Sequence, residues 1–204
     1  MNPDETVFAN RSERGKLRVT GPKRAWFLDQ ILTQSFEDMK PGDARDTALL
    51  TVHGRMTAYL EALTLEDSIL CHYESELTDV LPDALSRYLL ATDAAIDDVT
   101  DDFGLVLVVG RGWRALAEKA APGAPLQETS GLGTPAGYIW IERTAVDDIV
   151  SAVATEGARE ASEVELEALR IANGVARWGR EMDAKTFPQE AGVDERAVQY
   201  EKGC

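Results

Sequence analysis

Apolar residues in the first third of the chain alternate between strand spacing and helix spacing. Leu17–Thr20 has the pattern of a short strand, and the apolar residues of Trp26–Leu32 recur at the intervals of a helix. Pro22 suits the first turn of that helix, because proline lacks the N–H that would be unpaired there. Three strand patterns separated by short turns follow, at 48–52, 59–65 and 69–73. They predict a meander of antiparallel strands.

The middle of the chain continues with helices and strands in an irregular order. The apolar spacing predicts helices at 74–90, 113–120 and 145–158, strands at 96–99, 105–109 and 138–142, and a loop at 121–137. Helices that pack on largely antiparallel strands are typical of an α+β protein and not of a doubly wound parallel sheet. We expect two packed subdomains, about 1–95 together with the C-terminal segment, and about 96–165.

Composition narrows the possible functions. The chain has 204 residues, of which 44% are hydrophobic, so it can bury one large or two small cores. Its 36 acidic residues outnumber 21 basic ones, and a net charge of -15 argues against direct nucleic-acid binding. The polar start and the lack of an apolar stretch of about 20 residues predict a cytoplasmic protein without a membrane span. We predict no metal site, because the two cysteines, Cys71 and Cys204, lie far apart without metal-ligand spacing.

One glycine pattern imitates a nucleotide-binding loop. Gly110-Arg111-Gly112 with Ala115 fits a loose G-x-G-x-x-A pattern after a predicted strand. The dinucleotide fingerprint also requires open space for a pyrophosphate and a second parallel strand soon afterwards. Here the bulky Trp113 occupies the loop and a Gly/Pro-rich stretch follows. We interpret this segment as a simple turn between a strand and a helix.

The last forty residues carry the strongest functional signal. Leu169-Arg170-Ile171 with Gly174, then Trp178-Gly179 with Glu181 and Asp183, and finally Pro188-Gln189-Glu190 form an irregular polar segment after a helix. Such segments commonly line functional sites. Their motifs resemble the L-R-x-x-x-G and P-x-E stretches of the glycine-cleavage T-protein and its folate-binding relatives. Upstream motifs at 17–21, 27–28, 31–33, 41–42, 48–50, 54–55 and 107–110 are similar to the same family, so the resemblance covers nearly the whole chain.

The final residues indicate one branch of that family. Lys202-Gly203-Cys204, twelve residues after Glu190, is similar to the K-G-C-Y-x-G-Q-E signature of the YgfZ-type proteins. The sequence ends inside this motif, so the resemblance implies a fragment of 1–204 that lacks the family's C-terminal β-barrel.

The resemblance implies a site for tetrahydrofolate or a one-carbon-substituted folate. Glu190 matches the family position that binds the pterin, and a carboxylate can accept the ring N–H and the exocyclic amine together. Trp178 could stack on the ligand or belong to the core. Arg170 could bind a folate carboxylate or form an ion pair with a neighbouring acid. Cys204 is the family thiol, and Lys202 beside it could favour the thiolate.

One departure from the T-proteins concerns catalysis. T-proteins that transfer an aminomethyl carbon carry an Asp just after the Gly-Gly that aligns with Gly54-Arg55, whereas this chain has Met56, Thr57, Ala58 and Tyr59. None of these side chains can hold a proton as a carboxylate does. We therefore expect a folate-binding auxiliary protein that supports iron-sulfur client enzymes, including tRNA-modifying ones. The alternative is a folate-dependent aminomethyl or one-carbon transferase, so enzymatic activity is left open.

Overall fold

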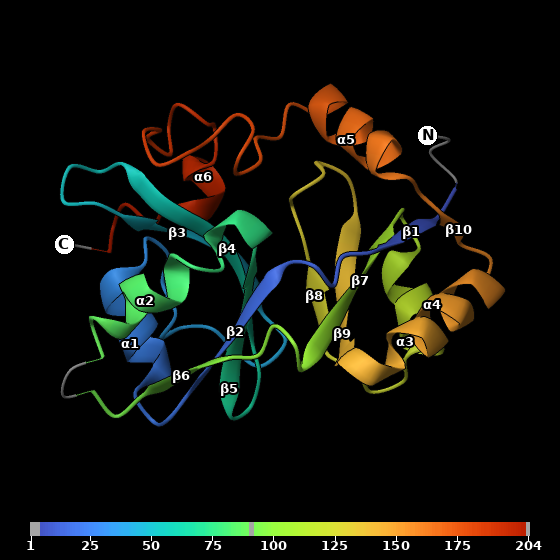
Figure 1. Cartoon of the computed structure of the whole chain (residues 1–204), viewed down its shortest axis with the longest axis horizontal. Coiled ribbons are helices and arrows are strands. Elements are labelled where there is room, and N and C mark those ends of the chain that lie inside the picture. The colour runs from blue at the N-terminus through green and yellow to red at the C-terminus, as the bar shows by residue number, and fades with distance from the viewer. Residues whose placement is uncertain (1–4, 90–91, 203–204) are drawn as a thin grey trace. The chain divides into compact units, whose positions relative to one another are not determined.

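The computed structural model describes residues 5–89 and 92–202 and divides the chain into two compact units. One unit combines Met1–Glu13 with Thr100–Val175, and the other combines Arg14–Val99 with Ala176–Cys204. Each unit contains a five-stranded sheet with packed helices, which confirms the α+β class (Figure 1). No helix in the described part of the chain is long and apolar enough to cross a membrane.

The sheet of the second unit is entirely antiparallel. Its strands follow the order β3-β4-β5-β2-β6, with bounds Ala44–Leu50, Met56–Thr64, Ser68–Tyr73, Gly15–Thr20 and Ala95–Asp98. The strands β3, β4 and β5 are the predicted meander. Its helices are α1 (Arg24–Ile31), the short 3-10 turn η1 (Ser75–Leu77), α2 (Leu81–Ser86) and α6 (Asp194–Ala197). Phe27, Leu28 and Phe36 are among the side chains buried in its core.

Two local expectations in this unit were wrong. The segment 74–90, predicted as one helix with Pro82 near its start or at a kink, is instead the short turn η1 followed by α2, and Pro82 lies in the first turn of α2. Pro22 does not enter the first turn of α1, whose N-cap is Lys23. The Lys23 N–H donates to the Asp93 carbonyl at 3.0 Å, which fixes where the helix begins.

The sheet of the first unit has the order β10-β1-β7-β9-β8. Its strands are Arg159–Glu160, Val7–Asn10, Phe103–Val109, Ala136–Glu142 and Leu126–Glu128. Its helices are α3 (Trp113–Ala120), η2 (Arg143–Ala145), α4 (Val146–Thr155) and α5 (Glu163–Ala172). The strand β8 lies within the stretch that the sequence predicted to be a loop. Its neighbour β9 supplies the pairing partner that local composition did not reveal.

The glycine pattern after β7 forms a structural turn. Both neighbours of β7, β1 and β9, run antiparallel to it, so the parallel arrangement of a dinucleotide-binding fold is absent at this strand. Trp113 is buried, and a Cβ on Gly137 would approach its ring to 2.2 Å. Gly137 is therefore needed for Trp113 to pack under the sheet.

Candidate functional site

The segment around Glu190 packs on the turn between β3 and β4. The Met56 N–H donates to the Thr186 carbonyl at 3.0 Å, and the Arg55 guanidinium donates to the Lys185 carbonyl. The Arg55 guanidinium also lies over the Phe187 ring, 4.6 Å from its centroid. A Cβ on Gly54 would lie 3.5 Å from the same ring. The fold thus brings together, within one unit, two motifs that are about 130 residues apart in the sequence.

Glu190 closes the turn that begins at Phe187. Its Oε2 accepts the Phe187 N–H at 2.9 Å, and its own N–H donates to the Phe187 carbonyl at 3.0 Å. The side chain is exposed, and its second oxygen has no hydrogen-bond partner within the described residues. One face of the carboxylate therefore remains available to a ligand, while the other is fixed by the loop.

Trp178 and Arg170 lie in packed surroundings. The indole of Trp178 is buried in the core of the second unit, where Trp178 also forms a backbone bridge with Met182. Arg170 belongs to α5 of the first unit, is buried, and pairs with the Glu167 carboxylate at 2.6 Å. It also donates to the Val175 carbonyl just beyond the end of the helix. A cation at a helix C-terminus stabilises that end.

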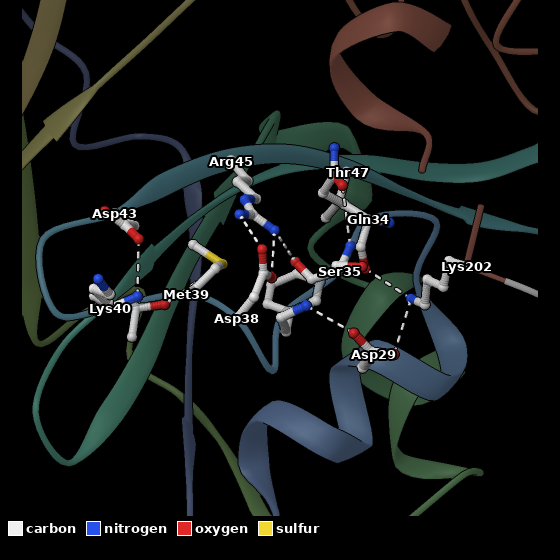
Figure 2. Close-up of polar contacts among 12 residues, drawn as sticks. Asp29, Gln34, Ser35, Asp38, Met39, Lys40, Asp43, Arg45, Thr47 and Lys202 are labelled. Atoms are coloured by element: carbon white, nitrogen blue, oxygen red, sulfur yellow. Dashed lines mark hydrogen bonds and ion pairs between the residues drawn. The ribbon is translucent and has the colours of Figure 1, made fainter. Parts of the chain in front are cut away.

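The C-terminal signature lies at the limit of the described residues. Cys204, the predicted thiol, falls outside them. Lys202 is described, and its ammonium donates to the Leu32 and Gln34 carbonyls at 2.6 and 2.7 Å, with the Asp29 carboxylate 3.7 Å away (Figure 2). Lys202 is thus held at the end of α1.

A buried polar group that the sequence did not reveal joins the strands β3 and β4 to α6. The Tyr59 hydroxyl donates to the Asp46 carboxylate at 2.8 Å and accepts from the Arg196 Nε at 3.0 Å. The Arg196 Nε also lies 3.2 Å from Asp46. Burial and the Asp46 charge raise the pKa of Tyr59 well above its usual value. Asp46 precedes the strand predicted at 48–52, and its partners depend on a strand register that the sequence does not show.

Asp46 begins a row of ionisable residues that crosses the sheet. In the strand register, Asp46 faces Glu61, Glu61 faces His72, and His72 faces Lys16. Directly opposed residues point to the same face of a sheet, and all four side chains are buried. Buried charges persist in folded proteins when they are paired.

Arg14 contacts two members of this row, His72 and Glu61, and also pairs with Glu74. Its Nε donates to His72 Nδ1 at 2.8 Å, and its two terminal nitrogens pair with Glu74 and, at 3.5 Å, with Glu61. A guanidinium does not give up its proton, so His72 Nδ1 must remain an acceptor. Arg14 therefore fixes the orientation of the His72 ring through Nδ1.

Comparison with known proteins identifies the fold. No family model matches the sequence. The chain is 24% identical over 228 residues to an Arabidopsis thaliana protein named as a chloroplastic transferase, At1g60990, covering 97% of this chain and 50% of that protein. The crystal structure of the glycine cleavage system aminomethyltransferase T from Bartonella henselae is similar with a TM-score of 0.86 and 16% identity. That match covers 98% of this chain and 59% of the transferase.

These similarities cover only part of each matched protein. The chain spans about half to three fifths of the length of the proteins it matches. At this level of identity the similarity concerns the fold, and the residues of the site have to be judged on their own contacts. The chain has the fold of the glycine-cleavage aminomethyltransferase T.

Proposed function

We propose that this chain binds tetrahydrofolate, or a one-carbon-substituted folate, with Glu190 accepting hydrogen bonds from the pterin. The observation that carries the proposal is the packing of the Phe187–Glu190 turn on Gly54–Arg55. Both segments match positions that the T-protein resemblance associates with folate chemistry. A carboxylate that is fixed on one side and exposed on the other is suited to the paired N–H donors of a pterin.

The chemistry near this turn favours binding over transfer of a one-carbon unit. The position expected to hold a catalytic acid is occupied by 56–59, where Tyr59 is buried against Asp46. The Asp46 carboxylate is itself engaged by the Tyr59 hydroxyl and by Arg196, whose Nε lies 3.2 Å away. We therefore propose an auxiliary protein that supports iron-sulfur cluster assembly or repair in client enzymes, including tRNA-modifying ones.

The proposal also covers the roles of three further residues, the cellular location and the partners. Trp178 and Arg170 act mainly through packing and pairing, each within its own unit, and Cys204 supplies the thiol. A cytoplasmic location stays a prediction, and the plant relative is named as chloroplastic. Contact with client enzymes without direct contact with nucleic acid also stays a prediction.

Two assays separate this proposal from the transferase alternative. In the first, an oxidatively damaged iron-sulfur enzyme is incubated with iron, sulfide, folate and either the wild-type chain or Glu190→Gln. We expect faster recovery of client activity with the wild type, and a slower recovery with the variant. In the second, the chain is incubated with an aminomethyl donor and tetrahydrofolate. Robust folate-dependent release of ammonia there would contradict the auxiliary role and favour the transferase.

A further inference from the structure

The C-terminal arm, defined here as Asp194–Lys202, is bound along the loop that follows α1. The Gln199 N–H donates to the Thr33 carbonyl at 2.9 Å, and the Thr33 hydroxyl donates to the Ala197 carbonyl at 2.6 Å. The Gln34 amide donates to the Arg196 carbonyl at 3.2 Å. These contacts fix the path of the arm as far as Lys202.

Lys202 ends the arm in a site with three acceptors. An ammonium has three N–H donors, and here two face the Leu32 and Gln34 carbonyls while Asp29 lies on the third side (Figure 2). Leu32 is the C-cap of α1, so the ammonium lies at the negative end of that helix. Lys202 therefore acts as a C-terminal cap supplied from about 170 residues away in the chain.

Asp29 connects this site to the loop behind it. One carboxylate oxygen faces Lys202, and the other accepts the Phe36 N–H at 2.8 Å. Phe36 is buried in the core of the same unit. A movement of Lys202 would thus disturb a loop that the core holds in place.

The same contacts engage the Lys202 ammonium with acceptors of the second unit. Its donors are directed at Leu32, Gln34 and Asp29, and the Asp29 charge offsets its own. Burial lowers the pKa of Lys202, whereas the Asp29 carboxylate acts in the opposite direction. A lysine lowers the pKa of a neighbouring thiol through its positive charge, and a nearby carboxylate opposes that effect.

We propose that Lys202 is a positioning residue, which fixes the backbone immediately before Gly203-Cys204 at the end of α1 and does not activate the thiol by its charge. This inference rests on the proposed function in one respect, since it treats Cys204 as the working thiol. It assigns to the lysine of the K-G-C motif a role distinct from thiolate stabilisation.

Two measurements on the full chain test the proposal. Nitroxide labels on Cys204 and on a cysteine introduced at the exposed Glu66 report the distribution of distances between them. Cys71 is buried, and burial raises the pKa of its thiol to about 12, so it should remain unlabelled. We expect a narrow distribution in the Glu66→Cys parent, a width at least doubled by Lys202→Met, and a smaller broadening with Asp29→Asn. Lys202→Arg should retain most of the narrow distribution, because a guanidinium can also donate to the carbonyls.

The second measurement is the pH dependence of Cys204 alkylation by iodoacetamide. We expect the midpoint in Lys202→Met to stay within about 0.3 pH units of the wild type, since one pKa unit would require a substantial charge interaction. An unchanged distance distribution in Lys202→Met, or a midpoint raised by about one unit, would overturn the proposal. Neither measurement requires folate. A failure of the Lys202 proposal can therefore be told apart from a failure of the folate site, which would appear as unchanged folate binding in Glu190→Gln.

Discussion

The guanidinium of Arg55 lies 4.6 Å from the centre of the Phe187 ring, and this contact joins the β3–β4 turn to the loop that carries Glu190. The same guanidinium donates to the Lys185 carbonyl. Two interactions of one side chain thus determine where the Glu190 carboxylate is presented. The geometry of the proposed folate site depends on a residue that does not itself have to touch the ligand.

Replacing Arg55 with Ala should loosen this loop while leaving the unit folded. A cation–π contact at an exposed site contributes about 0.5–1 kcal/mol, so we expect a small loss in the free energy of unfolding. The folate affinity should fall several-fold, because the loop must then be ordered during binding. Urea unfolding and folate titration measure the two effects. Arg180→Ala, at an exposed position of the same segment, is the control and should change neither.

Replacing Tyr59 with Phe should destabilise the second unit. The substitution removes a hydrogen bond to the Asp46 carboxylate and one from Arg196, and a hydrogen bond to a charged group contributes about 1.5–3 kcal/mol. Urea unfolding should show a loss in this range. Tyr88→Phe removes a hydroxyl from an exposed ring and should have almost no effect. Equal losses in the two variants would show that the buried polar group contributes little.

Replacing Arg14 with Met should cost about 3–5 kcal/mol, because it leaves Glu61 and Glu74 without their shared cation in a buried setting. Arg18→Met, on the strand β2 that begins directly after Arg14, is the matched control. Its partner Asp97 is exposed, and exposed pairs contribute about 0–1 kcal/mol. Chemical unfolding of both variants gives the comparison. A loss for Arg14→Met no larger than that for Arg18→Met would contradict the pairing described for Arg14.

Acid stability of the first unit should depend on Glu165. Hydrogen bonding by Arg159 and by Ser162 lowers the pKa of Glu165 to about 2 from an ordinary value of 4.5. A lowered folded-state pKa stabilises the protein above the unfolded-state pKa, and that contribution is lost as the pH falls from about 5 toward 2. Glu165→Gln should therefore show a shallower decline in melting temperature over this range. In an Arg159→Met background the same substitution should change the slope less, and an equal change would argue against Arg159 as the main cause.

Local patterns in the sequence accounted for much of the secondary structure. The meander β3–β5 and the helices α1 and α3 follow from alternation and helical spacing, since each buries one face on a core formed mainly by its neighbours. The pairing of β1 with β10 and β7 could not be predicted in this way. It joins short segments about 100 to 150 residues apart, and no local pattern encodes such contacts.

The candidate site was only partly visible in the sequence. Glu190 was singled out through its motif, but the packing of Phe187, at the start of its turn, on Arg55 is a long-range contact that the motif does not contain. Asp46 lay outside the predicted strands and Tyr59 was an ordinary strand residue, whereas the observed register places them diagonally across β3 and β4. Arg196 joins them from the C-terminal arm, which no periodicity connects to these strands.

Calorimetric titration of tetrahydrofolate into the wild type and into Glu190→Gln tests the central claim most directly. Glutamine keeps an oxygen that can accept the Phe187 N–H, so the turn should persist while the charge is lost. Glu195→Gln, at an exposed position on α6, is the matched control. We predict measurable binding by the wild type and the control, and an affinity about tenfold or more weaker for Glu190→Gln. Equal affinities in all three proteins, or no binding by the wild type, would contradict the proposed folate site.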